Sequence, residues 1–228
     1  MKSRGLLNVF GLLTIMLLIL GVAYAHWTDT VVIEGTIHMG ELIVGIREVC
    51  VTETTNGVPE DQFTPSKPWV ANTTVTLEDE ETSVHHDGET VYKKMIITIE
   101  NAYPQYDVHI EFKLKNAGTI PAILTDCELT GKDLTDDEDL TLVWYPEPYY
   151  DGEKWIGAGY IEDAAGNVIV NICITAYLRE DLQLEPCTDY DVIIDIDFKQ
   201  TAEECHTYTF EVTVDFVQWN KAGEVGGA

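Results

Sequence analysis

The fold of this chain is decided by the stretch Asp107-Val108-His109-Ile110-Glu111-Phe112-Lys113-Leu114-Lys115. Its even-numbered residues are apolar and its odd-numbered residues are charged or titratable. Because neighbouring side chains of a β-strand point to opposite faces, this period of two predicts a strand with one apolar face. Such strands are typical of antiparallel sheets that cover a core on one side and meet water on the other.

The same period recurs along most of the chain. Alternating or short apolar runs predict further strands at residues 31–39, 42–51, 92–100, 120–129, 140–145, 168–178, 191–199 and 207–217. No amphipathic helix pattern, internal repeat or flexible linker separates them. We therefore expect a single all-β domain over residues 41–228, a jelly-roll-like antiparallel β-sandwich of about eight or nine strands.

Residues 52–90 break this pattern. They contain three prolines and the acidic run at residues 78–81. We expect a long loop inserted into the domain, with one short strand near Val75. The segment also contains Asn72-Thr73-Thr74, which matches the acceptor motif for N-glycosylation, so Asn72 is a candidate glycosylation site.

The charge of the chain excludes several classes of partner. It carries 40 Asp and Glu residues against 13 Lys and Arg residues, a formal net charge of −27 at pH 7. Such an acidic protein has nothing with which to neutralise a row of phosphates, so we expect no nucleic-acid binding. For the same reason we expect no adhesion to an anionic membrane through a basic face.

Residues 1–25 have the pattern of an export signal. Lys2 and Arg4 precede an apolar run at residues 6–20, and the small-x-small sequence Ala23-Tyr24-Ala25 follows it. This pattern predicts cleavage after Ala25 and a secreted, extracellular protein. Two alternatives stay open. The apolar run is long enough to remain as a membrane anchor, and the dipeptide that begins at Arg4 resembles the cleavage site of pilin-type signals.

Export permits disulfides. The chain offers five cysteines, an odd number, so at least one of them has no partner within the chain. The sequence does not select a pairing, and no spacing matches the C-x-x-C of a zinc site. The candidates are Cys50, Cys127, Cys173, Cys187 and Cys205.

No stretch of the sequence is typical of an active site. Metalloprotease, phosphate-binding and dinucleotide-binding motifs are absent, and the serines of the domain lie outside any nucleophile motif. The acidic run at residues 136–139 lacks the alternating ligand spacing of a Ca²⁺ loop, and His85-His86 lies in a polar segment. We therefore expect no enzyme, no cofactor and no metal site.

One enzymatic alternative depends on cleavage after Ala25, which would make His26 the N-terminal residue. The amine and ring of an N-terminal His together chelate copper, and exported β-sandwich polysaccharide monooxygenases use this chelate with a second His. None of the candidates for that second ligand has a recognisable context. They are His38, His85, His86, His109 and His206.

The predicted strand at residues 31–39 precedes the rest of the domain. Its two faces differ as clearly as those of the stretch quoted first, since Thr30, Glu34, Thr36 and His38 share the polar face. Its extreme position leaves one end free, so it could thread into another copy without opening a loop. The apolar face carries Val31, Ile33, Gly35, Ile37 and Met39.

The order of these N-terminal features resembles that of exported TasA/camelysin-type proteins, which are biofilm-matrix fibre subunits, and of their archaeal bundling-pilus relatives. The resemblance rests on the Ala-ended signal, the segment His26-Trp27-Thr28-Asp29, the alternating strand and the glycine step at Gly40. Further likeness lies at residues 101–106, 116–122 and 216–220. The five cysteines and the segment at residues 52–90 depart from the pattern.

The resemblance implies a structural subunit of an extracellular filament on the cell surface. Residues 26–40 would then form a donor strand that fills an open edge groove in the next copy, giving a head-to-tail polymer. The implied partners are other copies of this chain and neighbouring filaments that bundle laterally.

Two other functions stay open. The strand could fold back into its own sandwich, leaving a monomeric or membrane-anchored surface protein. Such a protein could be an adhesin or a carbohydrate-binding module with a glycan as its partner, because aromatic side chains stack on sugars. The aromatic residues concerned are Trp144, Tyr145, Tyr149, Tyr150 and Trp155.

Overall fold

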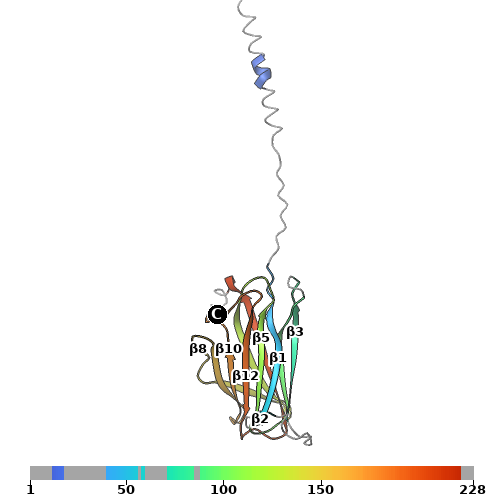
Figure 1. Ribbon diagram of the computed structural model, residues 1–228, viewed down its shortest axis with the longest axis vertical. Helices are drawn as coiled ribbons and strands as arrows, with labels where there is room; N and C mark the ends of the chain where they lie inside the picture. The colour runs from blue at the N-terminus through green and yellow to red at the C-terminus, as the bar shows by residue number, and fades with distance from the viewer. Residues whose placement is uncertain (1–11, 18–39, 56–57, 60–70, 85–87, 222–228) are drawn as a thin grey trace, which may run out of the picture. The chain divides into compact units, whose positions relative to one another are not determined.

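The computed structural model describes residues 12–17, 40–55, 58–59, 71–84 and 88–221 (Figure 1). The chain divides into two units, Met1–Met39 and Gly40–Ala228. In the first unit residues 12–17 are helical. Among the described residues, no helix combines the length and the apolar character needed to cross a membrane.

Several predicted features lie outside the described residues. They are the cleavage residues Ala23 and Ala25, the N-terminal His26, and the donor-strand residues Val31, Ile33, Gly35, Ile37 and Met39. The pair His85-His86 lies outside them as well.

The described residues of the second unit form strands and the short 3₁₀ helix η2, and all of their strand pairs are antiparallel. The bounds are β1 Val44–Thr55, β2 Val58–Pro59, β3 Asn72–Thr82, β4 Thr90–Ala102, β5 Tyr106–Asn116, β6 Ala122–Asp133, β7 Glu138–Trp144, β8 Tyr149–Tyr150, β9 Trp155–Glu162, β10 Val168–Ala176, β11 Gln183–Leu184, β12 Asp189–Phe198, β13 His206–Gln218 and η2 Trp219–Lys221.

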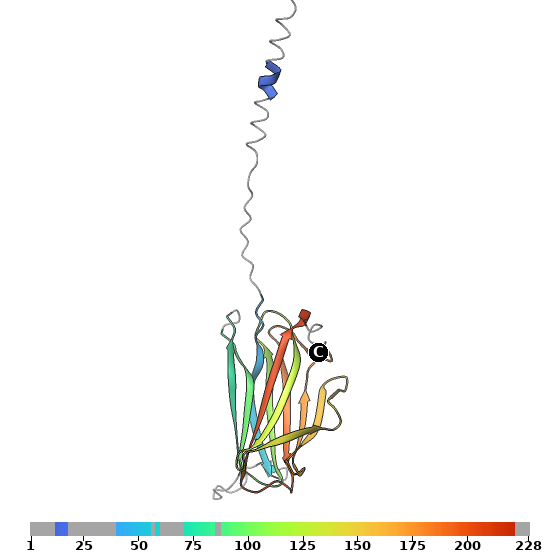
Figure 2. The same ribbon diagram turned by 180° about the vertical axis from the view of Figure 1, so that it is seen from behind.

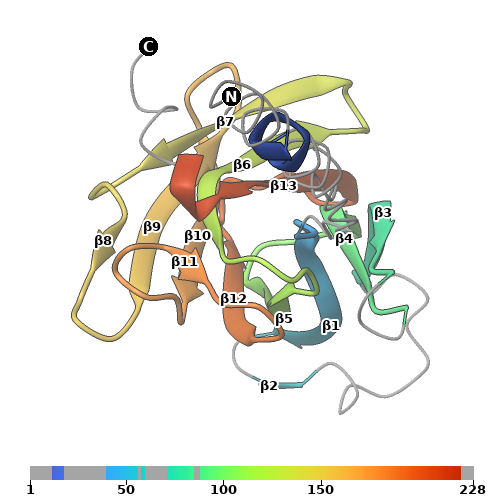
Figure 3. The same ribbon diagram turned by 90° about the horizontal axis from the view of Figure 1, so that it is seen from above.

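Nine strands form a closed ring in the order β1-β5-β12-β10-β9-β7-β6-β13-β4 (Figure 3). The ring closes where Ile46 of β1 pairs with Tyr92 of β4. A Cβ atom at Gly45 would lie 2.4 Å from the carbonyl oxygen of Tyr92, so this close approach requires glycine. The all-β antiparallel class is confirmed. The expected pair of separate sandwich sheets is wrong, because the sheet closes into a barrel.

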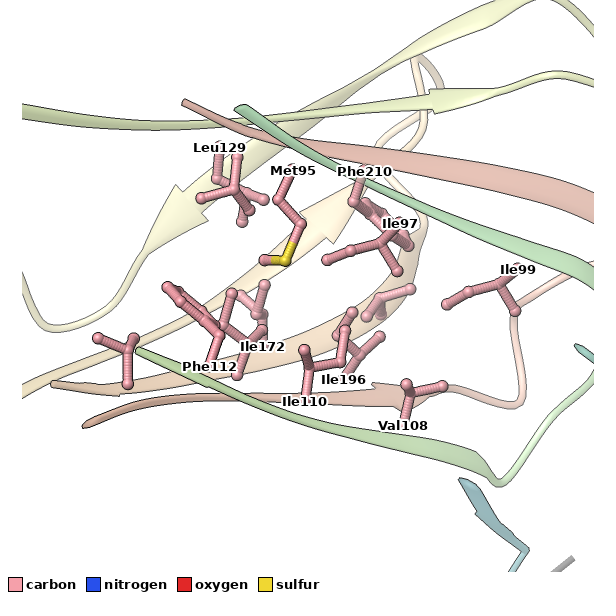
Figure 4. Packing of buried hydrophobic residues seen from close by; sticks show 14 of the residues in the cluster. Met95, Ile97, Ile99, Val108, Ile110, Phe112, Leu129, Ile172, Ile196 and Phe210 are labelled. Carbon is pink, nitrogen blue, oxygen red and sulfur yellow. The ribbon is translucent and has the colours of Figure 1, made fainter. Parts of the chain in front are cut away.

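The interior of the barrel is filled by the apolar faces that the sequence predicts. Val108, Ile110, Phe112 and Leu114 of β5 are all buried, and every other strand of the ring adds side chains to the same cluster. Figure 4 shows Met95, from β4, pointing across the core toward residues of the opposite wall. Burial of each such side chain stabilises the fold by roughly 1.5–3 kcal/mol.

Strand β3 corrects the prediction for residues 52–90. The sequence predicts one short strand near Val75, whereas β3 spans Asn72–Thr82 and pairs with β4 along its whole length. Val75 and Leu77 are half-buried on one face of β3. The acidic residues, which in the sequence are typical of a loop, form ion pairs with lysines of β4. Glu78, for example, lies 3.8 Å from the ammonium nitrogen of Lys94.

A buried asparagine organises the end of the barrel at which β1 and β6 begin. The side-chain amide nitrogen of Asn116 donates to the carbonyl oxygens of Ile120 and Leu184, and its oxygen accepts from the backbone N–H of Gly118. A Cβ atom at Gly40 would lie 2.1 Å from a methyl group of Ile120. The chain therefore enters the barrel beside the start of β6.

Candidate functional site

Strands β6 and β7 separate soon after the turn that joins them. They pair only over three residues each, at Gly131–Asp133 of β6 and Glu138–Leu140 of β7. Beyond this point β7 pairs with β9 through residues 141–144. Figure 2, seen from behind, shows β13 and β6 running side by side, while β7 crosses away from them. The pairing of β6 with β7 thus ends here, which leaves a gap in the strand pairing of the barrel wall.

Among the described strands, none pairs with one edge of β6 along this gap. The other edge pairs with β13 from Ala122 to Asp133. At its start β6 is also bonded to β11 and to the carbonyl oxygen of Leu182. In the described part of the chain, no strand pairs with the second edge over residues 125–130. An unpaired edge presents N–H and C=O groups to which a further strand can bind.

An apolar groove of about 310 Å³ lies behind this edge. Its floor comes from the inner faces of β5, β10, β12 and β13, and its walls come from β6 and from the segment β7 to β9. The lining residues are Phe112, Leu114, Leu124, Thr125, Asp126, Cys127, Leu129, Trp144, Pro148, Trp155, Gly157, Ile174, Ala176, Leu178, Leu182, Val192, Ile194, Val212 and Val214.

Part of the apolar core is exposed to solvent in the groove. Ile174 and Ala176 continue the inward alternation of β10, yet both are only half-buried, whereas Ile172 on the same face is buried. Cys127 pairs with the buried Val214 and lines the groove, but it is exposed. These inward-facing residues therefore lack the cover that the rest of the core receives.

Two tryptophans form the wall opposite β6. Trp144 and Trp155 both line the groove, and the indole N–H of Trp155 donates to the carbonyl oxygen of Arg179 at 3.0 Å. A Cβ atom at Gly157 would lie 3.1 Å from the Trp144 ring, so a glycine at this position leaves room for that ring beside β9. These two members of the predicted aromatic cluster thus turn inward.

Other members of that cluster stay outside. Tyr145 is 80% exposed and Tyr149 is 49% exposed. Tyr145 borders a second hollow, of about 470 Å³, on the outer surface of β9, β10 and β12. Tyr160, Asn171, Asp195 and Asp197 also line it. The hollow therefore combines aromatic rings with hydroxyl-binding amide and carboxylate groups.

The predicted disulfide and glycosylation residues are spread over the barrel. No disulfide joins any two of Cys50, Cys127, Cys173, Cys187 and Cys205, all of which lie in the described residues. Asn72, the candidate glycosylation site, is exposed at the first position of β3.

The described histidines among the copper candidates both contact carboxylates. His109 of β5 lies 3.0 Å from Glu111 and 2.6 Å from Asp195. These contacts raise the pKa of the His109 ring, the bond to Glu111 contributing most. His206 lies between Asp133 and Glu203. The two carboxylates beside His109 therefore stabilise a positive charge on that ring.

Comparison with protein-family models, with curated proteins and with solved structures gives no match for this chain. The apolar groove and the unpaired edge of β6 are therefore the observations from which we infer a function. The sequence did not point to them. Residues 120–129 have the composition of an ordinary strand. The sequence of a strand does not show whether a second strand pairs with each of its edges.

Proposed function

We propose that this protein is a structural subunit of an extracellular filament, in which residues 26–40 of one copy fill the groove of the next. The observation that carries this proposal is that the apolar groove lies beside the unpaired edge of β6 at residues 125–130, several of which line it. A hydrophobic pocket alone would suit many ligands. A pocket bordered by free backbone N–H and C=O groups suits an extended peptide segment.

The predicted N-terminal strand has the matching pattern. Val31, Ile33, Ile37 and Met39 are spaced by multiples of two, so an extended segment presents all four on one face. That face would cover Ile174 and Ala176, while the backbone pairs with residues 125–130 of β6. Gly35 supplies no side chain at the centre, which suits a narrow point in the groove.

A second copy is favoured over the same copy as the acceptor. Backbone hydrogen bonds already hold Glu41 and Ile43 to residues 117–119. Only Gly40 would then remain to reverse the chain direction, whereas a β-hairpin needs a loop of at least two residues. Insertion into another copy needs no reversal. Because donor and acceptor surfaces differ, the contact repeats head to tail and gives an open filament.

Electron microscopy of the mature chain tests this proposal. We expect negative-stain images of residues 26–228 to show filaments, and images of a variant lacking residues 26–39 to show monomers only. The far-ultraviolet circular dichroism of the shortened variant should keep its β-sheet signal, which controls for folding. Monomers from both chains would refute the proposal. Filaments from both would place the donor elsewhere.

Carbohydrate binding is a second candidate, favoured by the outer hollow beside Tyr145. A sugar ring could stack on its tyrosine rings, and the hydroxyl groups of that sugar could donate hydrogen bonds to its carboxylate and amide oxygens. A glycan array would detect such binding, and Tyr145→Ala should abolish it. Tyr149→Ala, which removes an exposed tyrosine outside this hollow, is the matched control. Equal binding by both variants would refute this candidate.

A further inference from the structure

A histidine and two aspartates from distant parts of the chain converge at the end of the barrel where β6 turns into β7. Asp133 is the last residue of β6, Asp136 lies in the turn, and His206 is the first residue of β13. One ligand atom from each lies within 4.8 Å of the other two. This convergence differs from an acidic surface run because it includes an imidazole and a buried carboxylate.

The buried carboxylate is held in a fixed position. Asp133 is only 6% exposed. Its Oδ1 atom accepts from the backbone N–H of Thr135 at 2.8 Å and, more weakly, from that of Asp136 at 3.4 Å. Its Oδ2 atom lies 2.7 Å from Nδ1 of His206. One oxygen thus anchors the side chain while the other faces the imidazole.

The imidazole is oriented from its far side. Nε2 of His206 lies 2.9 Å from Oε2 of Glu203, which leaves Nδ1 directed at the aspartates. A carboxylate bonded to the second ring nitrogen is the arrangement that orients histidine ligands in metal sites. Hydrogen bonds also join the β6–β7 turn to the start of β13. The backbone N–H of Thr207 donates to the hydroxyl oxygen of Thr135, and its carbonyl oxygen accepts from the N–H of Leu134.

We propose that Asp133, Asp136 and His206 bind a divalent first-row transition metal ion, with Zn²⁺ as the best match. Imidazole nitrogen with carboxylate oxygen suits such an ion better than Ca²⁺, which takes six to eight oxygen ligands. Without metal, a proton occupies the 2.7 Å contact between His206 and Asp133. The metal ion takes its place on Nδ1, and the proton passes to water.

The site lies at the end of the short β6–β7 ladder, beyond the residues of β6 that line the groove. Asp133 pairs with Glu138 in the short β6–β7 ladder. On its other side, Asp133 pairs with Tyr208 in the β6–β13 ladder. A metal ion bound here would join the β6–β7 turn to β13. It would therefore brace the ladder in which β6 and β7 are still paired. The site itself does not depend on the proposed filament, so either proposal can fail alone.

Calorimetric titration of the tag-free mature chain with ZnCl₂ tests the site. We expect one equivalent to bind, and His206→Gln and Asp136→Asn each to weaken binding at least tenfold. Asp137→Asn is the matched control, because Asp137 is the next residue but pairs with Lys132. Thermal unfolding of each variant without metal checks that it folds.

A second measurement separates this site from one made by cysteines. Cys205 precedes His206, so Cys205→Ser is titrated in parallel and should bind Zn²⁺ as the parent does. X-ray absorption of the Zn²⁺ complex should show nitrogen and oxygen ligands without sulfur. The proposal is overturned by an absence of Zn²⁺ binding, by loss of binding in Cys205→Ser, or by unchanged affinity in His206→Gln and Asp136→Asn.

Discussion

Gly131 of β6 and Leu140 of β7 form the last pair before the two strands separate. A Cβ atom at Gly131 would lie 3.2 Å from the Phe210 ring and 3.3 Å from Cβ of Leu140. The absence of a side chain therefore lets β6 lie close to β13 and β7 together. On the far side of this pair the wall of the barrel opens into the apolar groove.

A larger residue at Gly131 should force these strands apart. We expect Gly131→Val to lower the free energy of unfolding by roughly 1–3 kcal/mol, the usual cost of overpacking. Urea unfolding followed by tryptophan fluorescence measures it. Thr130→Val, at the exposed neighbouring position, should change stability far less. Equal effects of the two substitutions would contradict the close packing at Gly131.

Truncation of core residues should distinguish the closed part of the core from the groove. Ile110 is completely buried, whereas Ile174 lies half-buried in the groove. In the variant lacking residues 26–39, we expect Ile110→Ala to cost about 3 kcal/mol and Ile174→Ala about half of that. Urea unfolding measures both. Equal costs would mean that Ile174 is covered even without residues 26–39.

Filling the groove should block assembly without unfolding the protein. Ala176→Trp adds a large apolar side chain to the groove lining, where the side chain of residue 176 is half-buried. We expect stability within about 1 kcal/mol of the parent, because open space receives the ring, and loss of filaments in sedimentation and electron microscopy. Gln200→Trp places the same ring on the surface and should assemble normally. Normal assembly of Ala176→Trp would contradict occupation of the groove.

A pair of carboxylates should make stability fall as pH rises. Asp107 lies directly opposite Asp197 in the β5–β12 ladder, and burial, together with the charge of Asp197, raises the pKa of Asp107 to about 6. In the unfolded chain the pKa is about 3.9. Between these values the folded state binds more protons, so the free energy of unfolding decreases with rising pH.

Asp107→Asn should remove this dependence. We expect it to stabilise the protein at pH 7.5 by about 1 kcal/mol, allowing for solvent screening of a half-buried pair, and to have little effect near pH 4. Urea unfolding at both pH values measures the difference. Asp215→Asn, at an exposed position of β13, is the control. A stabilisation that is the same at both pH values would rule out titration of Asp107 as its cause.

The strands of the core could be predicted from the sequence because their side chains obey a local rule. In β5 the apolar residues alternate with polar ones, and β12 and β13 follow the same alternation except at Ile193 and at residues 216–217. The structure buries the alternating apolar residues. The full length of β3 could not be predicted, because the acidic side chains after Leu77 have the pattern of a solvated loop. Their ion pairs with Lys93 and Lys94 depend on the pairing of β3 with β4, which the sequence does not show.

The closure of the barrel and the groove could not be predicted, because both are relationships between strands distant in the sequence. Nothing near Gly45 indicates that it will meet Tyr92. Cys127 is a disulfide candidate in the sequence, and only its pairing with Val214 in the β6–β13 ladder shows that it faces inward. The metal candidates at Asp133 and His206 likewise meet only through the β6–β13 ladder.

Cys127 lines the groove and faces inward, so it allows the most direct measurement of the central claim. Cys50, Cys173, Cys187 and Cys205 are replaced by Ser, which leaves one thiol, in the groove. Ile33→Cys or Ile37→Cys then adds a second thiol on the apolar face of the donor strand. Glu34→Cys, on the opposite face, and Cys127→Ser are the controls.

The chains are oxidised during assembly and separated by non-reducing gel electrophoresis. If donor strands occupy the grooves of neighbouring copies, Ile33→Cys or Ile37→Cys gives a ladder of covalent multimers, and both controls leave monomers. A disulfide confined to single chains, or no cross-link to Cys127 at either donor position, would contradict the account.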